Sequence, residues 1–190
     1  VFNGDILTDF DIGSFVERHK QLGSAATLAL KPVENPSAYG LVETDSESRI
    51  LRFLEKPSED EIERLKINTI NAGIYVLEPE ILDLMPLGEN RSFEYDVFPE
   101  ILKRKMPFYA GIMTIEYWRD IGTPASYLAA HQDFLRGEIR GFDIDRSDLS
   151  DVATKAAIDS RSIIGEGCVI KPGARITNSV IGPGVQIEEK

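Results

Sequence analysis

The first 137 residues alternate between strand-like and helix-like patterns of hydrophobic and polar positions. Strands are predicted at 1–7, 25–30, 39–43, 50–55, 69–77, 108–114 and 115–118. Helices are predicted from Asp11 to Gly23, as a short helix from Pro79, around Pro99, and from Thr123 to Gly137. This alternation favours an α/β fold with a layered, Rossmann-like sheet, and antiparallel pairing of 39–43 with 50–55 makes the sheet mixed.

The last of these helices has the clearest start. Thr123 suits an N-cap and Pro124 suits the first helical position. The hydrophobic spacing that follows predicts a buried face made of Tyr127, Leu128, His131, Phe134 and Leu135.

A different pattern follows residue 157. Isoleucine recurs every six residues, with one five-residue step, at Ile158, Ile164, Ile170, Ile176, Ile181 and Ile187. A hexapeptide period is typical of a left-handed β-helix with its isoleucines inside. We therefore expect an α/β domain over 1–137, a polar linker over 138–157 and a short β-helix over 158–190. Because 158–190 spans fewer than two coils, the β-helix is expected to rest on the α/β domain or on a second copy in a homo-oligomer.

The charge balance limits the partners. The 190 residues include 21 basic and 32 acidic side chains, a formal net charge of −11. No basic surplus is present to neutralise phosphates, so neither a nucleic acid polymer nor an anionic membrane is an expected partner. No apolar run reaches the roughly 18–20 residues of a membrane span and no signal peptide is recognised, which predicts a cytoplasmic protein.

Two aspartates follow strand patterns and precede helix patterns. Asp5 in Asn-Gly-Asp would lie at the carboxyl end of a buried strand, where open α/β sheets bind ligands, and Asp120 lies in a similar connection. Either motif alone is also an ordinary turn. As a pair, two carboxylates are the hard oxygen ligands that Mg²⁺ prefers, and a metal would let this acidic chain bind a phosphorylated substrate.

Three further signals have both a functional and a structural interpretation. Lys56, between Glu55 and Pro57 at a strand end, either faces an anion or forms a surface charge pair. Asn71-Ala72-Gly73 within a strand suits either a closely approaching ligand or a β-bulge. Gly40 would likewise let a ligand approach the backbone closely.

Other chemistries find little support in the sequence. No dinucleotide-binding glycine motif, P-loop or G-x-S-x-G elbow occurs. The single cysteine, Cys168, excludes an internal disulfide, and it suits a core position in the repeat better than a nucleophile. Two histidines make a histidine-rich zinc site an unfavoured interpretation.

Several motifs occur in a fixed order: V-F-N-G-D, A-Y-G-L-V, F-L-E-K-P, N-A-G-I-Y-V-L, F-E-Y-D-V-F-P and W-R-D-I-G-T-P, followed by the hexapeptides. Together they resemble the sugar-nucleotide pyrophosphorylase family, nearest to bacterial mannose-1-phosphate guanylyltransferases and glucose-1-phosphate nucleotidyltransferases. The order and spacing of the motifs over nearly the whole chain carry this resemblance. It implies nucleotidyl transfer from a nucleoside triphosphate to a sugar 1-phosphate, with GTP and mannose 1-phosphate as the first choice and pyrophosphate as the second product.

The resemblance also implies roles for particular residues. Asp5 and Asp120 would hold the catalytic Mg²⁺, and Lys56 would bind the phosphate of the sugar 1-phosphate. The sugar itself would be bound by Glu55, through its hydroxyl groups, and faced by Gly40, Asn71 and Gly73.

The family's glycine-rich G-x-G-T-R-L-x-P-L-T loop and its P-K-P segment, which bind the triphosphate and read the base, have no match here. Val1 corresponds to a strand well inside the family's catalytic domain. We therefore expect that the N-terminal part is missing and that this chain alone does not catalyse the reaction. Alternatives are a glucose-1-phosphate thymidylyl- or uridylyltransferase, and a truncated non-catalytic relative that binds sugar phosphates or regulates a partner. A hexapeptide-repeat acyltransferase is disfavoured because no histidine follows His131.

Overall fold

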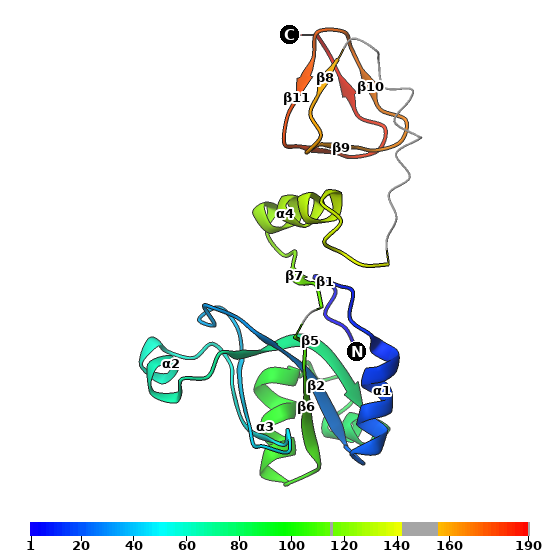
Figure 1. Cartoon of the computed structure of the whole chain (residues 1–190). Coiled ribbons are helices and arrows are strands. Elements are labelled where there is room, and N and C mark those ends of the chain that lie inside the picture. Colours follow the sequence, from blue (N-terminus) through cyan, green and yellow to red (C-terminus); the bar gives the residue numbers. More distant parts are fainter. Residues whose placement is uncertain (115, 142–155, 190) are drawn as a thin grey trace. The chain divides into compact units, whose positions relative to one another are not determined.

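The computed structural model describes residues 1–114, 116–141 and 156–189 (Figure 1). The chain divides into two compact units, one formed by residues 1–6 and 10–118 and the other by residues 7–9 and 119–190. Each unit has buried hydrophobic side chains of its own. Among the helices that the structure describes, none is long and apolar enough to cross a membrane.

The first unit is built on a five-stranded mixed sheet with the strand order β4-β3-β5-β2-β6. The strands are β2 (Ala26–Pro32), β3 (Leu41–Thr44), β4 (Ile50–Leu54), β5 (Thr69–Leu77) and β6 (Phe108–Ile112). Only β2 and β6 are parallel, and the other neighbours are antiparallel. The predicted α/β class with a mixed sheet is therefore confirmed.

The helices of the first unit are α1 (Ile12–Gln21), α2 (Glu59–Leu65) and α3 (Phe98–Lys103), with a 3₁₀ turn at Pro79–Leu84 and a π-helical turn at Phe93–Val97. Asp11 caps α1 as predicted, because its Oδ1 accepts from the Ser14 amide at 3.0 Å. Helix α2 was not predicted. It buries no residue, so it has no apolar stripe to reveal it, and it begins with a capping box between Ser58 and Glu61.

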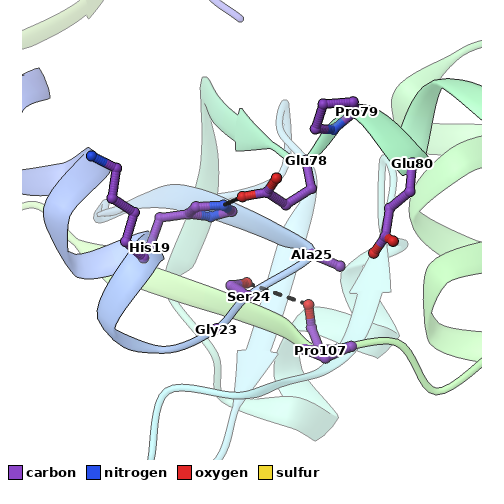
Figure 2. A pocket seen from close by; sticks show the side chains of 9 residues that line it. His19, Gly23, Ser24, Ala25, Glu78, Pro79, Glu80 and Pro107 are labelled. Carbon is purple, nitrogen blue, oxygen red and sulfur yellow. Dashed lines mark hydrogen bonds and ion pairs between the residues drawn. The ribbon is translucent and has the colours of Figure 1, made fainter.

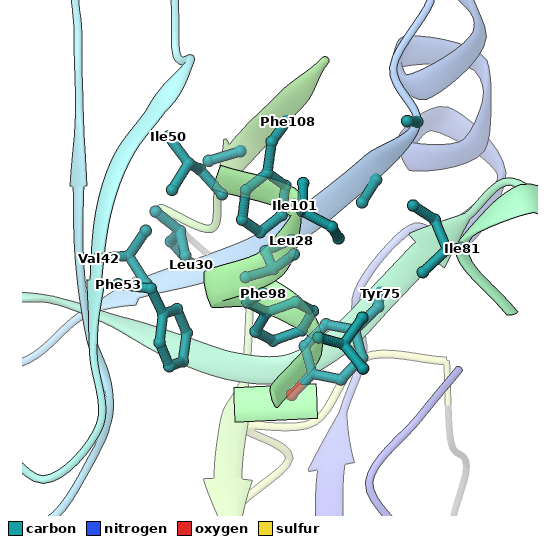
Figure 3. Close-up of a cluster of buried hydrophobic side chains, with 14 residues drawn as sticks. Leu28, Leu30, Val42, Ile50, Phe53, Tyr75, Ile81, Phe98, Ile101 and Phe108 are labelled. Atoms are coloured by element: carbon teal, nitrogen blue, oxygen red, sulfur yellow. The ribbon is translucent and has the colours of Figure 1, made fainter. Parts of the chain in front are cut away.

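Aromatic rings form the centre of the main core (Figure 3). The ring of Phe98 on α3 lies 5.2 Å from those of both Phe53 and Tyr75, and 5.5 Å from that of Phe108, measured between centroids. These residues come from β4, β5 and β6. The core thus joins α3 to one face of the sheet and fixes the strand ends on which the candidate site is built.

The opening segment differs from the predicted buried strand. Val1 exchanges two hydrogen bonds with the backbone of Tyr75 in β5, and the Asn3 amide donates to the Gly73 carbonyl, but Val1 and Phe2 remain 58% and 42% exposed. A turn closed by the Ile6 amide on the Asn3 carbonyl follows, and only then does β1 (Ile6–Thr8) begin. An apolar run alone does not distinguish a core strand from one at the rim of a sheet. Asp5 therefore lies in a turn after an exposed segment.

The strand predicted at 115–118 begins later, as β7 (Trp118–Asp120), and Ile115 lies outside the described residues. Strand β7 pairs with β1 in a two-stranded sheet. Its first residue is anchored, because the Trp118 indole donates to the Ala72 carbonyl at 2.9 Å.

In the second unit, α4 (Pro124–Leu135) begins at the predicted cap, but its most buried residues lie outside the predicted face. Ala130 and Asp133 are buried, whereas Tyr127 is 46% exposed and the other four predicted residues are half-buried. The carboxylate of Asp133 accepts from the Arg119 guanidinium at 2.8 Å and also pairs with Arg136. A buried carboxylate with charged partners is tolerated, so ion pairing decided the face that hydrophobic spacing did not predict.

All six predicted isoleucines end two-residue strands in the second unit. These strands are β8 (Ala157–Ile158), β9 (Ile163–Ile164), β10 (Val169–Ile170), β11 (Arg175–Ile176), β12 (Val180–Ile181) and β13 (Gln186–Ile187). They form three parallel pairs, β8 with β11, β9 with β12 and β10 with β13. Ile164, Ile170 and Ile176 are buried in one cluster, and the other three isoleucines pack against it.

The described parts of the predicted linker over 138–157 include residues with defined contacts. Ile139 is buried, the Arg140 guanidinium pairs with Asp9 at 3.0 Å, and Ala157 already belongs to β8. Residues 142–155 lie outside the described residues.

Candidate functional site

Three of the residues predicted to contact a sugar lie together at one end of the sheet. Gly40 precedes β3, Glu55 follows β4 and Asn71 lies in β5. The Asn71 amide donates to the Gly40 carbonyl at 2.8 Å. A Cβ placed on Gly40 would lie 2.6 Å from Oε2 of Glu55, so the absence of a side chain at Gly40 makes room for this carboxylate.

Two residues that the sequence analysis missed complete this group. The Asn71 side-chain amide donates to the Tyr75 hydroxyl oxygen at 2.8 Å, and that hydroxyl donates to Oε1 of Glu94 at 3.1 Å. Ser92 donates to Oε2 of Glu94 at 2.8 Å. We call Gly40, Glu55, Asn71, Tyr75 and Glu94 the polar cluster. Glu94 belongs to F-E-Y-D-V-F-P, but its distance along the chain from Asn71 gives no sign of their proximity.

The polar cluster carries negative charge in a half-buried setting. Burial raises the pKa of Glu55, the charge of Glu94 raises it further, and the charge of Lys56 lowers it. Burial also raises the pKa of the Tyr75 hydroxyl, against the hydrogen bond from Asn71. Tyr75 therefore stays a neutral donor, while the carboxylates offer acceptors to a ligand with hydroxyl groups.

Lys56 directly follows Glu55 of the polar cluster in the chain. It is exposed, and it has a φ of +48°, in the left-handed region that non-glycine residues rarely adopt. The following residue, Pro57, is buried. Within the described part of the chain Lys56 has no ion-pair partner, and its charge is felt by Glu55. The arrangement leaves an ammonium group next to a set of hydrogen-bond acceptors.

Gly73 has a structural explanation. The register between β2 and β5 shifts at Leu28/Leu30, and Gly73 has a φ of +72° at this bulge. A Cβ on Gly73 would lie 2.9 Å from Nδ2 of Asn3. The close approach predicted at Gly73 is thus made by a residue of the same chain.

The two aspartates predicted to hold a metal belong to different units. Asp5 is exposed in its turn in the first unit. Asp120 belongs to the second unit, where its Oδ1 accepts from the Gly122 amide at 2.8 Å and its carbonyl accepts from the Ser126 hydroxyl. Among the described residues, no three acidic, histidine or cysteine side chains form a metal-binding group. Mg²⁺ is commonly bound by one or two carboxylates with substrate phosphates, so the donor chemistry of two aspartates fits this ion.

A separate cavity of about 420 Å³ lies beside α1 and the start of the 3₁₀ turn (Figure 2). His19, buried at its wall, contacts Thr27 Oγ1 through Nδ1 at 2.8 Å and Glu78 Oε1 through Nε2 at 3.1 Å. Ser24 donates to the Ala26 carbonyl. These polar groups have their partners within the protein, and none of the residues predicted for the site lines this cavity.

Comparison with known proteins agrees with the motifs. Residues 1–137 match the family described as Nucleotidyl transferase, and the chain belongs to this family. The chain is 34% identical to the mannose-1-phosphate guanylyltransferase of Mycobacterium tuberculosis, over 99% of this chain and 53% of that protein. It is 33% identical to the UTP–glucose-1-phosphate uridylyltransferase of Synechocystis, over 100% of this chain and 57% of that protein. The predicted resemblance to sugar-nucleotide pyrophosphorylases is confirmed.

A solved structure supports the fold. A protein of Bacillus anthracis described as a glucose-1-phosphate thymidylyltransferase, crystallised with a sucrose, superimposes with a TM-score of 0.60 at 22% identity. The alignment covers 77% of this chain and 56% of that one. The chain spans about half the length of the curated relatives it matches.

Proposed function

We propose that this chain carries the sugar-phosphate-binding part of a sugar-1-phosphate nucleotidyltransferase. The best-supported reaction is GTP plus mannose 1-phosphate to GDP-mannose and pyrophosphate, because proteins named mannose-1-phosphate guanylyltransferase recur among the relatives. A uridylyltransferase for glucose 1-phosphate is similar to this chain to almost the same degree. Glucose 1-phosphate with UTP or dTTP is therefore the alternative.

The observation that carries the proposal is the grouping of Gly40, Glu55 and Asn71, with Lys56 adjacent to Glu55. A hexose 1-phosphate has hydroxyl groups at one end and a dianion at the other. Carboxylates and a carboxamide suit the hydroxyls, whereas a lysine suits the phosphate. We assign Glu55, Asn71 and the Gly40 backbone to the sugar and Lys56 to its phosphate. Gly73 then supports this site by shaping the bulge that follows Asn71.

The chemistry needs positioning more than proton transfer. A phosphate oxygen of the sugar 1-phosphate attacks the α-phosphorus of the triphosphate, a new P–O bond forms, and the bond to the leaving pyrophosphate breaks. The nucleophile is already an anion, so no general base is required. Lys56 lowers the repulsion between the two polyanions on the sugar-phosphate side.

A bound Mg²⁺ would supply further charge neutralisation for the phosphates. Asp5 and Asp120 are the residues that the resemblance assigns to it, and their carboxylates have the right donor chemistry. This metal site, like the location of the protein in the cytoplasm, stays a prediction.

We also propose that 158–190 forms a left-handed β-helix, that 138–157 links it to the α/β domain of 1–137, and that copies of the chain associate through it. The parallel pairing of strands 17 or 18 residues apart supports a coil of three hexapeptides per turn. Exposed Val169 and Val185, on consecutive turns, offer apolar surface for such contacts.

Isothermal titration calorimetry of the 190-residue chain tests the proposal. The ligands are α-D-mannose 1-phosphate, α-D-glucose 1-phosphate and inorganic phosphate. At least one hexose 1-phosphate is expected to bind at least about tenfold more tightly than inorganic phosphate, since the polar cluster adds hydrogen bonds to hydroxyl groups. Equal or undetectable binding of all three ligands would contradict the proposal.

A further inference from the structure

Glu94 is held at both carboxylate oxygens. Oε2 accepts from the Ser92 hydroxyl at 2.8 Å and Oε1 accepts from the Tyr75 hydroxyl at 3.1 Å. Ser92 is itself fixed, because its Oγ accepts from the amides of Glu94 and Tyr95 at the start of the π-helical turn. The carboxylate of Glu94 is thus positioned by its own turn before any ligand arrives.

The acceptor at Glu94 determines the direction of the hydrogen bonds. An ionised carboxylate only accepts, so the single hydroxyl proton of Tyr75 points to Glu94. The Tyr75 oxygen is then free only to accept, and it must receive a donor from Asn71. This requires Nδ2 of Asn71 to face Tyr75, at 2.8 Å, while Oδ1 accepts from the Gly73 amide at 3.1 Å. One orientation of the Asn71 carboxamide results, with one N–H and one lone pair left over.

Tyr75 transmits this constraint because its ring is packed within the core. It is 2% exposed, and its ring lies 5.2 Å from that of Phe98 (Figure 3). The ring of Phe93 lies 5.7 Å from it, measured between centroids as well. A ring packed in a core keeps one rotamer. The positions of Asn71 and Glu94 are therefore coupled through a rigid group.

The charge of Glu94 has a second effect. It acts on Glu55, so two carboxylates influence the same region. Hydroxyl groups, which can donate to carboxylates, are favoured there, whereas a phosphate is repelled. Lys56, the residue that follows Glu55 in the chain, remains the place for the anion.

We propose that Glu94 is a positioning residue for sugar recognition. Through the Tyr75 hydroxyl it holds the carboxamide of Asn71 in one orientation, so that Asn71 and Glu55 bind hydroxyl groups of a hexose ring and the phosphate is directed away from the two carboxylates. This inference rests on the proposed function.

Tyr75→Phe removes only the bridging hydroxyl, and Tyr95→Phe is its matched control, because Tyr95 is 61% exposed. In calorimetry, Tyr75→Phe is expected to weaken binding of α-D-mannose 1-phosphate about tenfold and to leave inorganic phosphate binding unchanged. Tyr95→Phe should change neither. A loss of both ligands together with a lowered unfolding temperature would assign Tyr75 a structural role and overturn the inference.

Glu94 is tested by a pair of variants. Glu94→Ala removes the acceptor and is expected to match the loss in Tyr75→Phe, whereas Glu94→Gln keeps an acceptor oxygen for Tyr75 and should recover most of the affinity. Glu63→Gln on α2, which is exposed, is the control for the change in net charge. Full wild-type affinity in Glu94→Ala would overturn the inference.

A ligand-free measurement separates this inference from the proposed function. The Asn71 side-chain amide resonance in NMR spectra should shift in Tyr75→Phe and in Glu94→Ala but not in Tyr95→Phe. If the wild type binds no hexose 1-phosphate better than inorganic phosphate, the proposed function fails whatever the resonance does. If the wild type binds the sugar and both variants leave the affinity and the resonance unchanged, only the inference fails.

Discussion

Gly40 and Glu55 are so close that a Cβ on Gly40 would lie 2.6 Å from Oε2 of Glu55 and 3.0 Å from Cζ of Phe53. The carboxylate is the end of a flexible side chain, so it can move, whereas Phe53 lies in the core. Gly40→Ala is therefore expected to fold, with a stability loss of about 1 kcal/mol. Because it displaces Glu55, it should weaken hexose 1-phosphate binding about tenfold, as measured by calorimetry.

The matched control is Gly182→Ala, where a Cβ meets no atom within 4 Å. This variant should keep both stability and affinity. Wild-type affinity in Gly40→Ala would mean that the position of Glu55 does not matter for binding.

Glu55 should make stability depend on pH. Its pKa in the folded chain is raised above the ordinary value of 4.5, chiefly by burial and then by the charge of Glu94. A raised pKa favours folding at low pH, and that contribution is lost as pH rises through the folded value. Glu55→Gln lacks this loss, so its unfolding free energy should rise relative to wild type between about pH 4 and pH 7. Urea denaturation over this pH range measures the difference.

Glu61 provides a control of opposite sign. Hydrogen bonds from Ser58 lower its pKa, so its contribution to stability is lost as pH falls. Glu61→Gln should therefore lose stability relative to wild type as pH rises. If the difference in unfolding free energy from wild type changed with pH in the same direction for both variants, the environment of Glu55 would be excluded as the cause.

His19 is expected to be important for stability and not for ligand binding. It is 2% exposed, it contacts Glu78 (Figure 2) and its other ring nitrogen contacts the Thr27 hydroxyl. His19→Ala leaves a void and an unpaired buried hydroxyl on Thr27, at a cost of about 2–4 kcal/mol. His131→Ala, at a half-buried site where the ring contacts both the carbonyl and the ring of Tyr127, should cost about 1 kcal/mol or less. Equal losses in urea denaturation would contradict this difference.

The isoleucine cluster of the second unit allows a test at neighbouring positions. Ile170 is 3% exposed, whereas Val169 is 49% exposed. Ile170→Ala should destabilise the coil by about 2–4 kcal/mol, and Val169→Ala by about 1 kcal/mol or less. The Lys171 amide donates to the Ile187 carbonyl at 2.9 Å, so its hydrogen exchange with solvent should become faster in Ile170→Ala. Slower or unchanged exchange in Ile170→Ala would exclude an inward role for the isoleucines.

Local signals in the sequence predicted much of the fold. Asp11 and Thr123 cap their helices because their side-chain oxygens accept hydrogen bonds from backbone amides three residues further along the chain. The hexapeptide isoleucines fall on strands because the period sets which side chain points inward. The buried face of α4 was not predictable in this way, because Asp133 is buried through its pairing with Arg119, a contact between separate elements.

The site residues that belong to sequence motifs were predictable, whereas those that only the fold brings into contact were not. Gly40, Glu55 and Asn71 were named from motifs, and the sheet brings them together. Tyr75 falls in the strand predicted at 69–77, and its hydroxyl contacts Glu94, which lies 19 residues further along the chain. Hydrophobic periodicity places a ring but does not indicate what its hydroxyl meets.

The most direct test of sugar 1-phosphate binding at this site is the effect of Lys56→Ala on the affinity of the 190-residue chain for α-D-mannose 1-phosphate. Lys66→Ala is the control, because Lys66 is also exposed and also has a left-handed backbone, with a φ of +52° against +48° for Lys56. Lys56→Ala is expected to weaken binding at least about tenfold, through the loss of the charge that meets the phosphate, and Lys66→Ala is expected to leave it unchanged. Equal affinity in the two variants would contradict the assignment of this site to a sugar 1-phosphate.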